Sequence, residues 1–188
     1  MTTDRWEDPD GVPTLDAGPV RLRQFALDDV PGIVDASTDP LIPLISSIPS
    51  NSSEAEAVEF VDRQRRCRSD GFGYSFAVAE TANDRLVGGL GLWLRDMDQG
   101  RVSAGYWMLP RARRQGCASH ALRAASRWAL TVLGVPRLEL YAEPWNEASI
   151  RTAESAGFVR EGLLRSWQEV AGKRRDMYMY SLLNSDLP

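Results

Sequence analysis

The sequence predicts a mixed α/β (α+β) fold, built as a single domain around one central sheet. Three strand-like segments follow one another closely in the middle of the chain, and strand-like and helix-like segments alternate after them. With 188 residues, 43% of them hydrophobic, the chain is long enough to bury one core. We find no internal repeat or low-complexity linker between residues 18 and 184, and expect one domain there, preceded by a flexible acidic arm at 1–17.

The expected strands share short alternating or continuous apolar patterns bounded by turn-forming residues. They cover 19–25, 74–80, 85–95, 101–109, 137–143, 158–168 and 174–183. The segments "TAND" and "DMDQG" are rich in turn formers, so the three strands from 74 to 109 should form an antiparallel meander.

The expected helices show apolar residues at helical spacing and recognisable end signals. They cover a short, proline-interrupted region at 27–38, then 52–71, 115–133 and 146–157. Ser53 and Glu56 have the spacing of a capping box, and Asn146 is expected to cap the last helix. The helix over 115–133 should stop at Gly134 and Pro136.

Composition excludes several classes of protein. The formal net charge of −4 argues against general nucleic-acid binding, and no apolar run approaches the roughly 20 residues that span a bilayer. The acidic, Pro/Gly-rich N-terminus resembles neither a signal peptide nor a transit peptide. Two cysteines without a CxxC or Cys/His cluster argue against a disulfide framework and against a metal site. We therefore expect a cytoplasmic protein.

The stretch "PRARRQGCASHALRAASRWAL" (110–130) concentrates positive charge where a helix begins. Three arginines, Arg111, Arg113 and Arg114, precede Gly116. The first turn of a helix has free N–H groups and partial positive charge, glycine allows close approach, and arginines add donors, so this is a candidate pyrophosphate site. The alternative is a solvated turn with an incidental glycine. Neither a P-loop nor GxGxxG is present, and "GGLG" (88–91) is interpreted as close-packed or bulged sheet.

The segment "YWMLPRARRQGCASHALRAASRWAL" resembles the acetyl-CoA motif of the GNAT acyltransferase superfamily, with Arg113, Gly116 and Ala118 at its three defining positions. "LELYAEPWNEASIRTAESAGF" is similar to the family's next strand and Asn-capped helix. "REGLLRSWQEVAGKRRDMYMYSLL" is similar to the closing strand pair of the ribosomal-protein N-acetyltransferase (RimJ/RimL-like) branch. The resemblance covers residues 18–184.

The resemblance implies a GNAT-type domain, with a mostly antiparallel sheet flanked by helices and splayed in a V between 101–109 and 137–143. Acetyl-CoA, the acyl donor, would lie in the gap. The strand end would meet its pantetheine arm and the helix start its pyrophosphate. The residues expected to bind it are Met108, Leu109, Arg113, Arg114, Gln115, Gly116, Cys117, Ala118, Asn146 and Ser149.

Acetyl transfer to an amine needs a base for the ammonium, a donor for the oxyanion and a donor for the departing thiolate. The resemblance implies that a strand N–H near Met108 meets the oxyanion. The tyrosine that many relatives use for the thiolate is replaced by Ala153, whereas the ribosomal-protein branch uses a serine at the position of Ser149. That serine has the alternative of bonding only to its own helix.

The base stays open in the sequence. Glu143 ends a strand that lines the gap, and Glu169 lies near a glutamate of the ribosomal-protein branch. Direct matching places Gln168 at that position, so Glu169, Glu143 or water would take the proton. His120, the single histidine, is expected beside phosphate and away from the acetyl group, and Cys117 is expected to be chemically inert.

These features predict an acetyl-CoA-dependent N-acetyltransferase working by direct attack in a ternary complex, without a metal. The expected acceptor is the α-amine of a protein N-terminus. The alternatives are a small-molecule amine, such as an antibiotic or metabolite, and a non-catalytic acyl-CoA sensor. We expect no nucleic-acid or membrane partner, and a homodimer stays open.

Overall fold

The computed structural model describes residues 11–187. Every strand and helix expected from the sequence is present, with ends that differ by a few residues, and two short elements, β1 and α2, were not expected. In chain order the elements are β1 (Leu15–Ala17), β2 (Val20–Arg23), α1 (Val30–Ser37), α2 (Ile42–Ile45), α3 (Glu54–Arg66), β3 (Gly73–Glu80), β4 (Leu86–Trp93), β5 (Arg101–Met108), α4 (Cys117–Thr131), β6 (Arg137–Ala142), α5 (Glu147–Ser155), β7 (Val159–Val170) and β8 (Lys173–Leu183).

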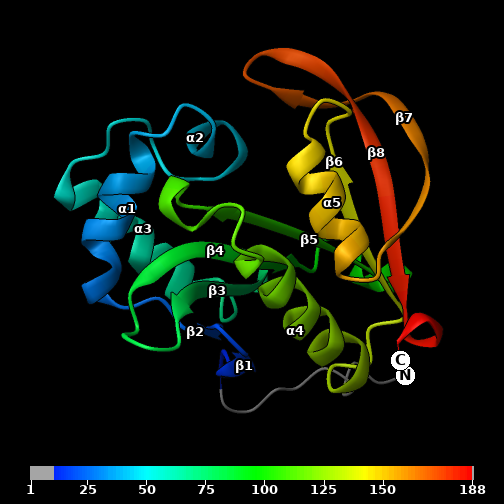
Figure 1. Cartoon of the computed structure of the whole chain (residues 1–188), viewed down its shortest axis with the longest axis horizontal. Coiled ribbons are helices and arrows are strands. Elements are labelled where there is room, and N and C mark those ends of the chain that lie inside the picture. The colour runs from blue at the N-terminus through cyan, green and yellow to red at the C-terminus, as the bar shows by residue number, and fades with distance from the viewer. Residues whose placement is uncertain (1–10, 188) are drawn as a thin grey trace.

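The strands form one eight-stranded sheet in the order β1-β2-β3-β4-β5-β6-β8-β7. All neighbours pair antiparallel except β5 and β6, which are parallel and are connected through α4. In Figure 1 the strands up to β5, with α1, α2 and α3, form one half of the molecule, and β6, β7 and β8 with α5 form the other. The predicted mixed, mostly antiparallel sheet flanked by helices is therefore confirmed.

Two apolar clusters cover the two faces of the sheet. One joins the sheet to α4 and α5, and includes the stripe Leu122, Ala125 and Ala129 of α4. Within it the Trp128 ring meets Tyr74 edge-on, with ring centroids 4.8 Å apart. The other cluster joins α1 and α3 to the opposite face. Each helix thus hides its apolar stripe against the sheet, as amphipathic patterning requires.

The helix ends follow the predicted chemistry. The Ser53 amide donates to the Glu56 carboxylate (2.8 Å), and the Glu56 amide donates back to the Ser53 hydroxyl (3.3 Å), which completes a capping box. The side chain of Asn146 accepts from the Ser149 amide (3.1 Å) and caps α5. No helix of residues 11–187 is long and apolar enough to cross a membrane.

The expected arm at 1–17 needs a correction at its end. Leu15–Ala17 form β1, which pairs antiparallel with β2, and Ala17 is buried against the core. A three-residue strand carries too short an alternation to be recognised in sequence. Residues 1–10 lie outside the described part of the chain.

The sheet divides between its two parallel strands. β5 and β6 pair over only four positions, from Arg101 opposite Arg137 to Ala104 opposite Leu140. β5 then continues along β4 as far as Met108, whereas β6 continues along β8 as far as Ala142. The strands therefore separate beyond Ala104 and Leu140, which is the V-shaped opening that the sequence predicts.

The glycines of β4 allow close packing across the β4–β5 pair, as expected from "GGLG". A Cβ on Gly88 would collide with the carbonyl oxygen of Trp107, and one on Gly89 would lie 2.6 Å from the indole nitrogen of the same tryptophan. The buried Trp107 ring thus occupies the space above Gly89. Glycine is required at these two positions because any side chain would collide with Trp107, and not because the backbone has a positive φ.

Gly88→Ala is expected to destabilise the fold by about 1–3 kcal/mol, because the new methyl group meets backbone that cannot move away. Gly162→Ala in β7 is the matched control, since a Cβ there meets nothing within 4 Å. Chemical denaturation of both variants measures the difference. Equal midpoints for the two variants would contradict the packing argument.

Candidate active site

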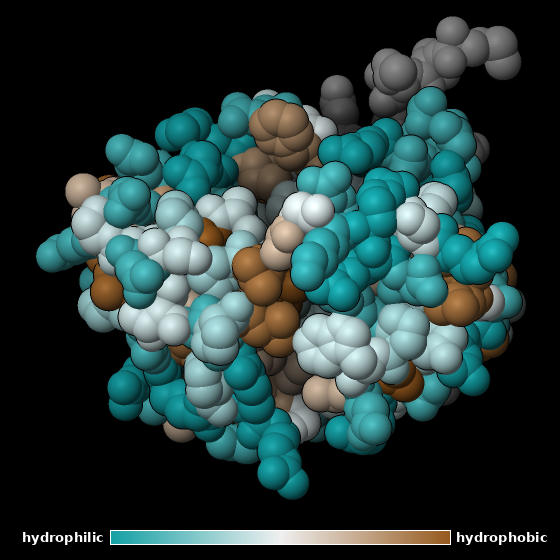
Figure 2. Space-filling model, turned by 90° about the horizontal axis from the view of Figure 1, so that it is seen from above, coloured by the Kyte–Doolittle hydropathy of each residue, from teal (hydrophilic) through white to brown (hydrophobic). Residues whose placement is uncertain are grey.

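A cavity of about 1000 Å³ runs through the point where β5 and β6 separate. Its walls come from both halves of the molecule: α2, the segment before β3, the end of β4 and the middle of β5 on one side, and β6, α5, β7 and β8 on the other. Figure 2 shows apolar side chains gathered along a hollow between more polar flanks. Consecutive residues of β5 (Gly105 and Tyr106) and of β6 (Tyr141 and Ala142), which point to opposite faces of the sheet, both line the cavity, so two ligands can meet inside it from opposite sides.

β5 supplies backbone N–H groups that are free to donate into this gap. The Leu109 amide donates to the Val87 carbonyl on β4 (2.9 Å), and the Leu109 carbonyl accepts from Ala112 (2.9 Å). Because successive residues direct their backbone groups to opposite edges of a strand, the N–H groups of Met108 and Tyr106 point away from β4 and into the gap. Of the two predicted contacts, Met108 therefore offers a free amide, while Leu109 uses its backbone groups inside the protein.

The start of α4 has the features of an anion site. Gly116, at the N-cap, has a left-handed backbone (φ +79°), which favours glycine there. The first intrahelical bond runs from the His120 amide to the Gly116 carbonyl, so the amides of Cys117, Ala118 and Ser119 have no partner within the helix. The first turn contains no acidic residue. These amides and the helix dipole together favour a pyrophosphate.

The three arginines before α4 differ in their contacts. Arg111 binds Asp35 (2.6 Å) and the Leu86 carbonyl (2.8 Å), and its own carbonyl accepts from the Gln115 side chain (2.7 Å). Arg111 and Gln115 thus brace the loop. Arg114 is exposed in a left-handed conformation and forms no ion pair within residues 11–187, which leaves it available to phosphate.

Arg113 connects the loop to α2, which lines the cavity on the same side as β4 and β5. Its guanidinium donates to the Met108 carbonyl (3.0 Å) and pairs with the buried Asp39 (2.9 Å). Asp39 also accepts from the amides of Leu41 and Ile42 at the start of α2. Burial alone would raise the pKa of the Asp39 carboxyl, but these amides and Arg113 outweigh it and hold the pKa below its usual value. Arg113 therefore has a structural role in addition to its place in the motif.

Ser149 faces the gap together with a residue that sequence reasoning missed. The Ser149 hydroxyl lies 3.1 Å from the Tyr106 hydroxyl, and both residues line the cavity with Asn146. Burial raises the pKa of Tyr106, against hydrogen bonds with Ser149 and Thr152 that lower it, so the phenol stays protonated near neutral pH. The alternation of β5 could have placed Tyr106 on this face, but the contact with α5 depends on tertiary packing.

Glu143 lies at the end of β6, on the cavity wall, with its side chain 11% exposed. Its carboxylate accepts from the Trp145 indole (2.7 Å) and lies 3.8 Å from the Arg175 guanidinium. The only other carboxylate that lines the cavity within residues 11–187 is Asp96. Glu143 is therefore the predicted base that the fold brings to the site.

Glu169 does not belong to the site. The β7–β8 pairing is irregular between Leu164 and Gln168, where Ser166 has a left-handed backbone (φ +49°). After this irregularity Gln168 and Val170 line the cavity, and Glu169 is exposed opposite Arg174. The prediction of Glu169 as a catalytic residue is thus corrected, because no sequence signal fixed the position of the irregularity.

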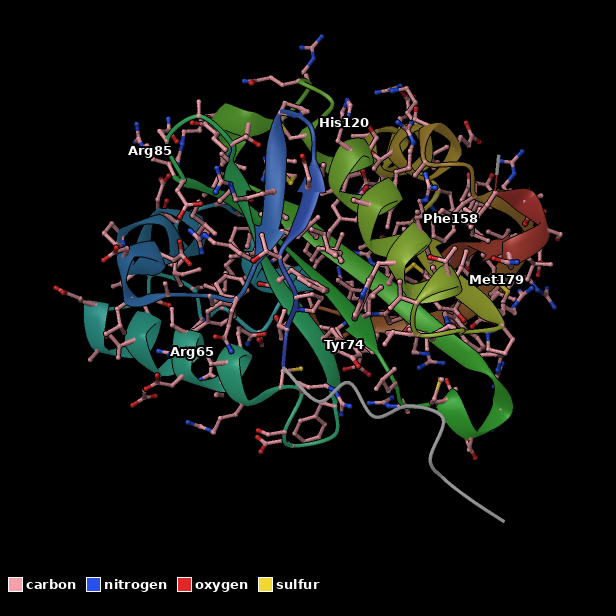
Figure 3. The ribbon with its side chains drawn as sticks, turned by 90° about the horizontal axis from the view of Figure 1, so that it is seen from below. Arg65, Tyr74, Arg85, His120, Phe158 and Met179 are labelled. Atoms are coloured by element: carbon pink, nitrogen blue, oxygen red, sulfur yellow. The ribbon has the colours of Figure 1, made fainter. Side chains whose placement is uncertain are left out.

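Two further residues of α4 that the sequence singles out are Cys117 and His120. Cys117 is buried, and burial raises the pKa of its thiol, which disfavours a nucleophilic thiolate. His120 is exposed in the first turns of α4, beside the turn between β1 and β2 (Figure 3). A Cβ on Gly18 in that turn would lie 3.7 Å from the His120 ring. Neither side chain lines the cavity.

The chemistry open to this arrangement is transfer between two ligands. On the face covered by α4 and α5, the gap offers backbone amides, Ser149, Tyr106 and the anion site. On the other face it offers Glu143. A donor with a diphosphate can lie along the first face while an amine reaches it from the second.

The comparisons with known proteins agree with this geometry. A family model described as "Acetyltransferase (GNAT) domain" matches residues 20–159. An uncharacterized N-acetyltransferase, p20, of Bacillus licheniformis is 27% identical over 173 residues, which are 92% of this chain and 97% of the relative.

Two solved structures have the same fold over nearly their full length. Mycobacterium smegmatis RimJ, in complex with CoA-disulfide, superposes with a TM-score of 0.81 at 22% identity, covering 96% of this chain and 90% of that one. A putative ribosomal-protein-serine acetyltransferase from Vibrio cholerae superposes with a TM-score of 0.74 at 25% identity, covering 97% and 99%.

Ser119→Asp tests the anion site at the start of α4. A carboxylate in the first turn favours the helix but repels a diphosphate, so binding and folding should respond in opposite directions. We expect the Kd for acetyl-CoA to rise at least about tenfold, equivalent to about 1.4 kcal/mol, without loss of thermal stability. Calorimetric titration measures the Kd.

Ser119→Asn is the control for Ser119→Asp, because it changes the side chain without adding charge. Its Kd should stay close to that of the unaltered protein. Normal acetyl-CoA binding by the Asp variant would place the diphosphate elsewhere.

Proposed function

Because this chain belongs to the GNAT acetyltransferase family, and is therefore an N-acetyltransferase, we propose that it acetylates the α-amine of a protein N-terminus by direct attack on acetyl-CoA in a ternary complex. The observation that carries the proposal is the cavity through the divided sheet, with Ser149 on one face and Glu143 on the other. Membership of this family favours an enzyme over the alternative of a non-catalytic acyl-CoA sensor.

The donor would lie with its diphosphate on the amides of 116–119 and its thioester beside β5. The Met108 N–H, directed into the gap, would stabilise the oxyanion that develops on the acetyl carbonyl. Ser149 would donate a hydrogen bond to the departing sulfur, and Tyr106, 3.1 Å from Ser149, would donate to Ser149 in turn. This pair takes the place of the tyrosine that Ala153 replaces.

Glu143, directly or through water, would take the proton of the attacking ammonium. One partly buried carboxylate is modest help for a base, and that bears on the acceptor. An α-amine has an ordinary pKa near 8, about two units below that of a lysine side chain, so more of it is already deprotonated near neutral pH. The site therefore suits an α-amine better than a lysine.

The names of the relatives agree with this acceptor. The Vibrio cholerae neighbour is described as acting on a ribosomal protein, and the Mycobacterium smegmatis neighbour is a RimJ. A relative from Bacillus subtilis, 30% identical over 101 residues, is named as a putative ribosomal N-acetyltransferase. A small-molecule amine is the second candidate, because the cavity is open enough to admit one.

Short peptides with free and with blocked N-termini test the acceptor. Each peptide carries an internal lysine, and release of free CoA thiol measures turnover beside a panel of aminoglycosides and polyamines. We expect turnover on the free peptides and little on the blocked ones, because the α-amine is the group that is acetylated. Equal rates on both, or turnover confined to a small amine, would overturn the N-terminal acceptor and leave the acetyltransferase in place.

Ser149→Ala and Tyr106→Phe are expected to lower kcat about 10²-fold each, within the range for a positioned acid–base group, with little change in the Kd for acetyl-CoA. If the two hydroxyls act as one unit, the double variant should be scarcely slower than either single variant. Ser155→Ala, on the same helix, is the control. If kcat is unaltered in Ser149→Ala, under conditions where chemistry limits the rate, then water and not Ser149 assists the departing thiolate.

A further inference from the structure

Exposed aromatic side chains are concentrated in the cavity. Among residues 11–187, ten large hydrophobic side chains are exposed, and five of them line this one cavity. These five are Ile45, Phe72, Trp93, Trp145 and Trp167. Scattered exposed apolar residues need no explanation, but a contiguous group in a concave site indicates a ligand surface.

Trp93 lines the cavity, and Gly91 makes room for its indole. A Cβ on Gly91 would collide with the Trp93 indole, and one on Gly105 would lie 3.5 Å from the indole nitrogen. Gly91 and Gly105 are direct partners across β4 and β5. The indole therefore lies over this pair, and Trp93 lines the cavity and remains 39% exposed.

The aromatic side chains of the other half are also held in place. Trp145 donates its indole N–H to the Glu143 carboxylate at 2.7 Å. Trp167 stacks on Tyr141, with ring centroids 5.8 Å apart and planes at 26°. The Tyr141 hydroxyl in turn donates to the buried Glu139 at 2.7 Å. Such rings are pre-organised for a flat partner, since little side-chain freedom remains to be lost on binding.

The charges beside these rings are nearly balanced. Glu143 and Asp96 line the cavity, but Arg95 lines it too, and Arg175 lies 3.8 Å from Glu143. One ammonium can therefore approach Glu143, whereas the further cationic groups of a polycation would meet as many arginines as carboxylates. The balance disfavours polyamines and lysine-rich peptides as acceptors.

We propose that the preferred acceptor carries a planar aromatic group beside its amine, which for a peptide is an aromatic N-terminal residue. The aromatic ring would lie between Trp93 of one half and Trp167 of the other, with the amine directed to Glu143 and the gap. Aromatic rings attract one another beyond simple burial of area, which favours a ring over an aliphatic chain of similar size. This inference rests on the proposed acetyl transfer to an amine.

The test compares acceptors that differ only in the group beside the amine. Peptides of one sequence begin with Phe, Trp, Leu, Ala or Lys, and a parallel set contains phenethylamine, tryptamine, cyclohexylethylamine and spermidine. In whichever set is turned over, we expect kcat/KM for the aromatic members to exceed that of the aliphatic and polycationic members at least about tenfold. Equal or higher kcat/KM for Ala, Leu or spermidine would overturn the inference.

Variants connect the preference to the rings. Trp93→Leu and Trp167→Leu should each reduce the ratio of Phe-peptide to Ala-peptide kcat/KM toward one. Leu27→Ala removes an exposed apolar side chain outside this cavity and should leave the ratio unchanged. An unchanged ratio in both tryptophan variants would also overturn the proposal.

Failure of the proposed function is distinguishable from failure of this inference. If only the small amines are turned over, the N-terminal acceptor is rejected. The kcat/KM values of the aromatic and non-aromatic amines still test the aromatic preference. If neither set is turned over, quenching of tryptophan fluorescence by phenylalanine amide and by alanine amide, each with CoA present, gives the ranking as a ratio of Kd values. Equal Kd values would then reject the aromatic preference.

Discussion

The limited pairing of β5 with β6 is the constraint on which the site depends. Each strand has a stronger partner on its other side: β5 pairs with β4 over six positions, and β6 pairs with β8 over six, whereas β5 and β6 share four. The two halves of the sheet are thus each complete, and the open backbone between them is left for a ligand. Strand amides without a hydrogen-bond acceptor cost free energy when they are buried. A ligand that accepts hydrogen bonds from them is therefore favoured in this gap.

The arginines of an acidic chain show how one motif serves both fold and site. Arg113 forms an ion pair with Asp39, and Asp39 accepts hydrogen bonds from the first amides of α2. This helix forms a wall of the cavity. The loop that would receive the diphosphate is therefore joined through a buried ion pair to the wall that would face the acceptor. Removing one partner of such a pair leaves an uncompensated charge, so the connection is strong in the folded protein even though its net contribution to stability is small.

Local signals predicted the parts of the site that depend on local backbone. The position of Gly116 at the start of α4 and of Asn146 at the cap of α5 follow from residue type and spacing alone. The ion-pair partners of Arg111 and Arg113 lie more than 70 residues earlier in the chain, and no spacing rule reports them. The same holds for Tyr106, whose contact with Ser149 joins a strand to a helix 43 residues later.

Irregular elements account for the remaining differences. α2 has four residues, includes a proline, and is fixed by Asp39, so its sequence shows no helical periodicity. After the irregular pairing near Ser166, Gln168, the residue that direct matching gives, lines the cavity and Glu169 is exposed. Strand alternation predicts which side chains share a face only while the pairing is regular, and β7 carries one extra residue between Arg160 and Gly162 and two between Leu164 and Gln168.

The aromatic walls and the proton chemistry of the cavity reinforce each other. A site lined by Trp93, Trp145 and Trp167 excludes much of its water once an acceptor is bound, and charges interact more strongly where water is excluded. In the proposed reaction, the hydrogen bond from Trp145 to Glu143 and the one between Tyr106 and Ser149 would then meet little competition from solvent. An acceptor with a ring to fill this space would complete the exclusion of water, so recognition of the acceptor and assistance to its deprotonation depend on the same side chains.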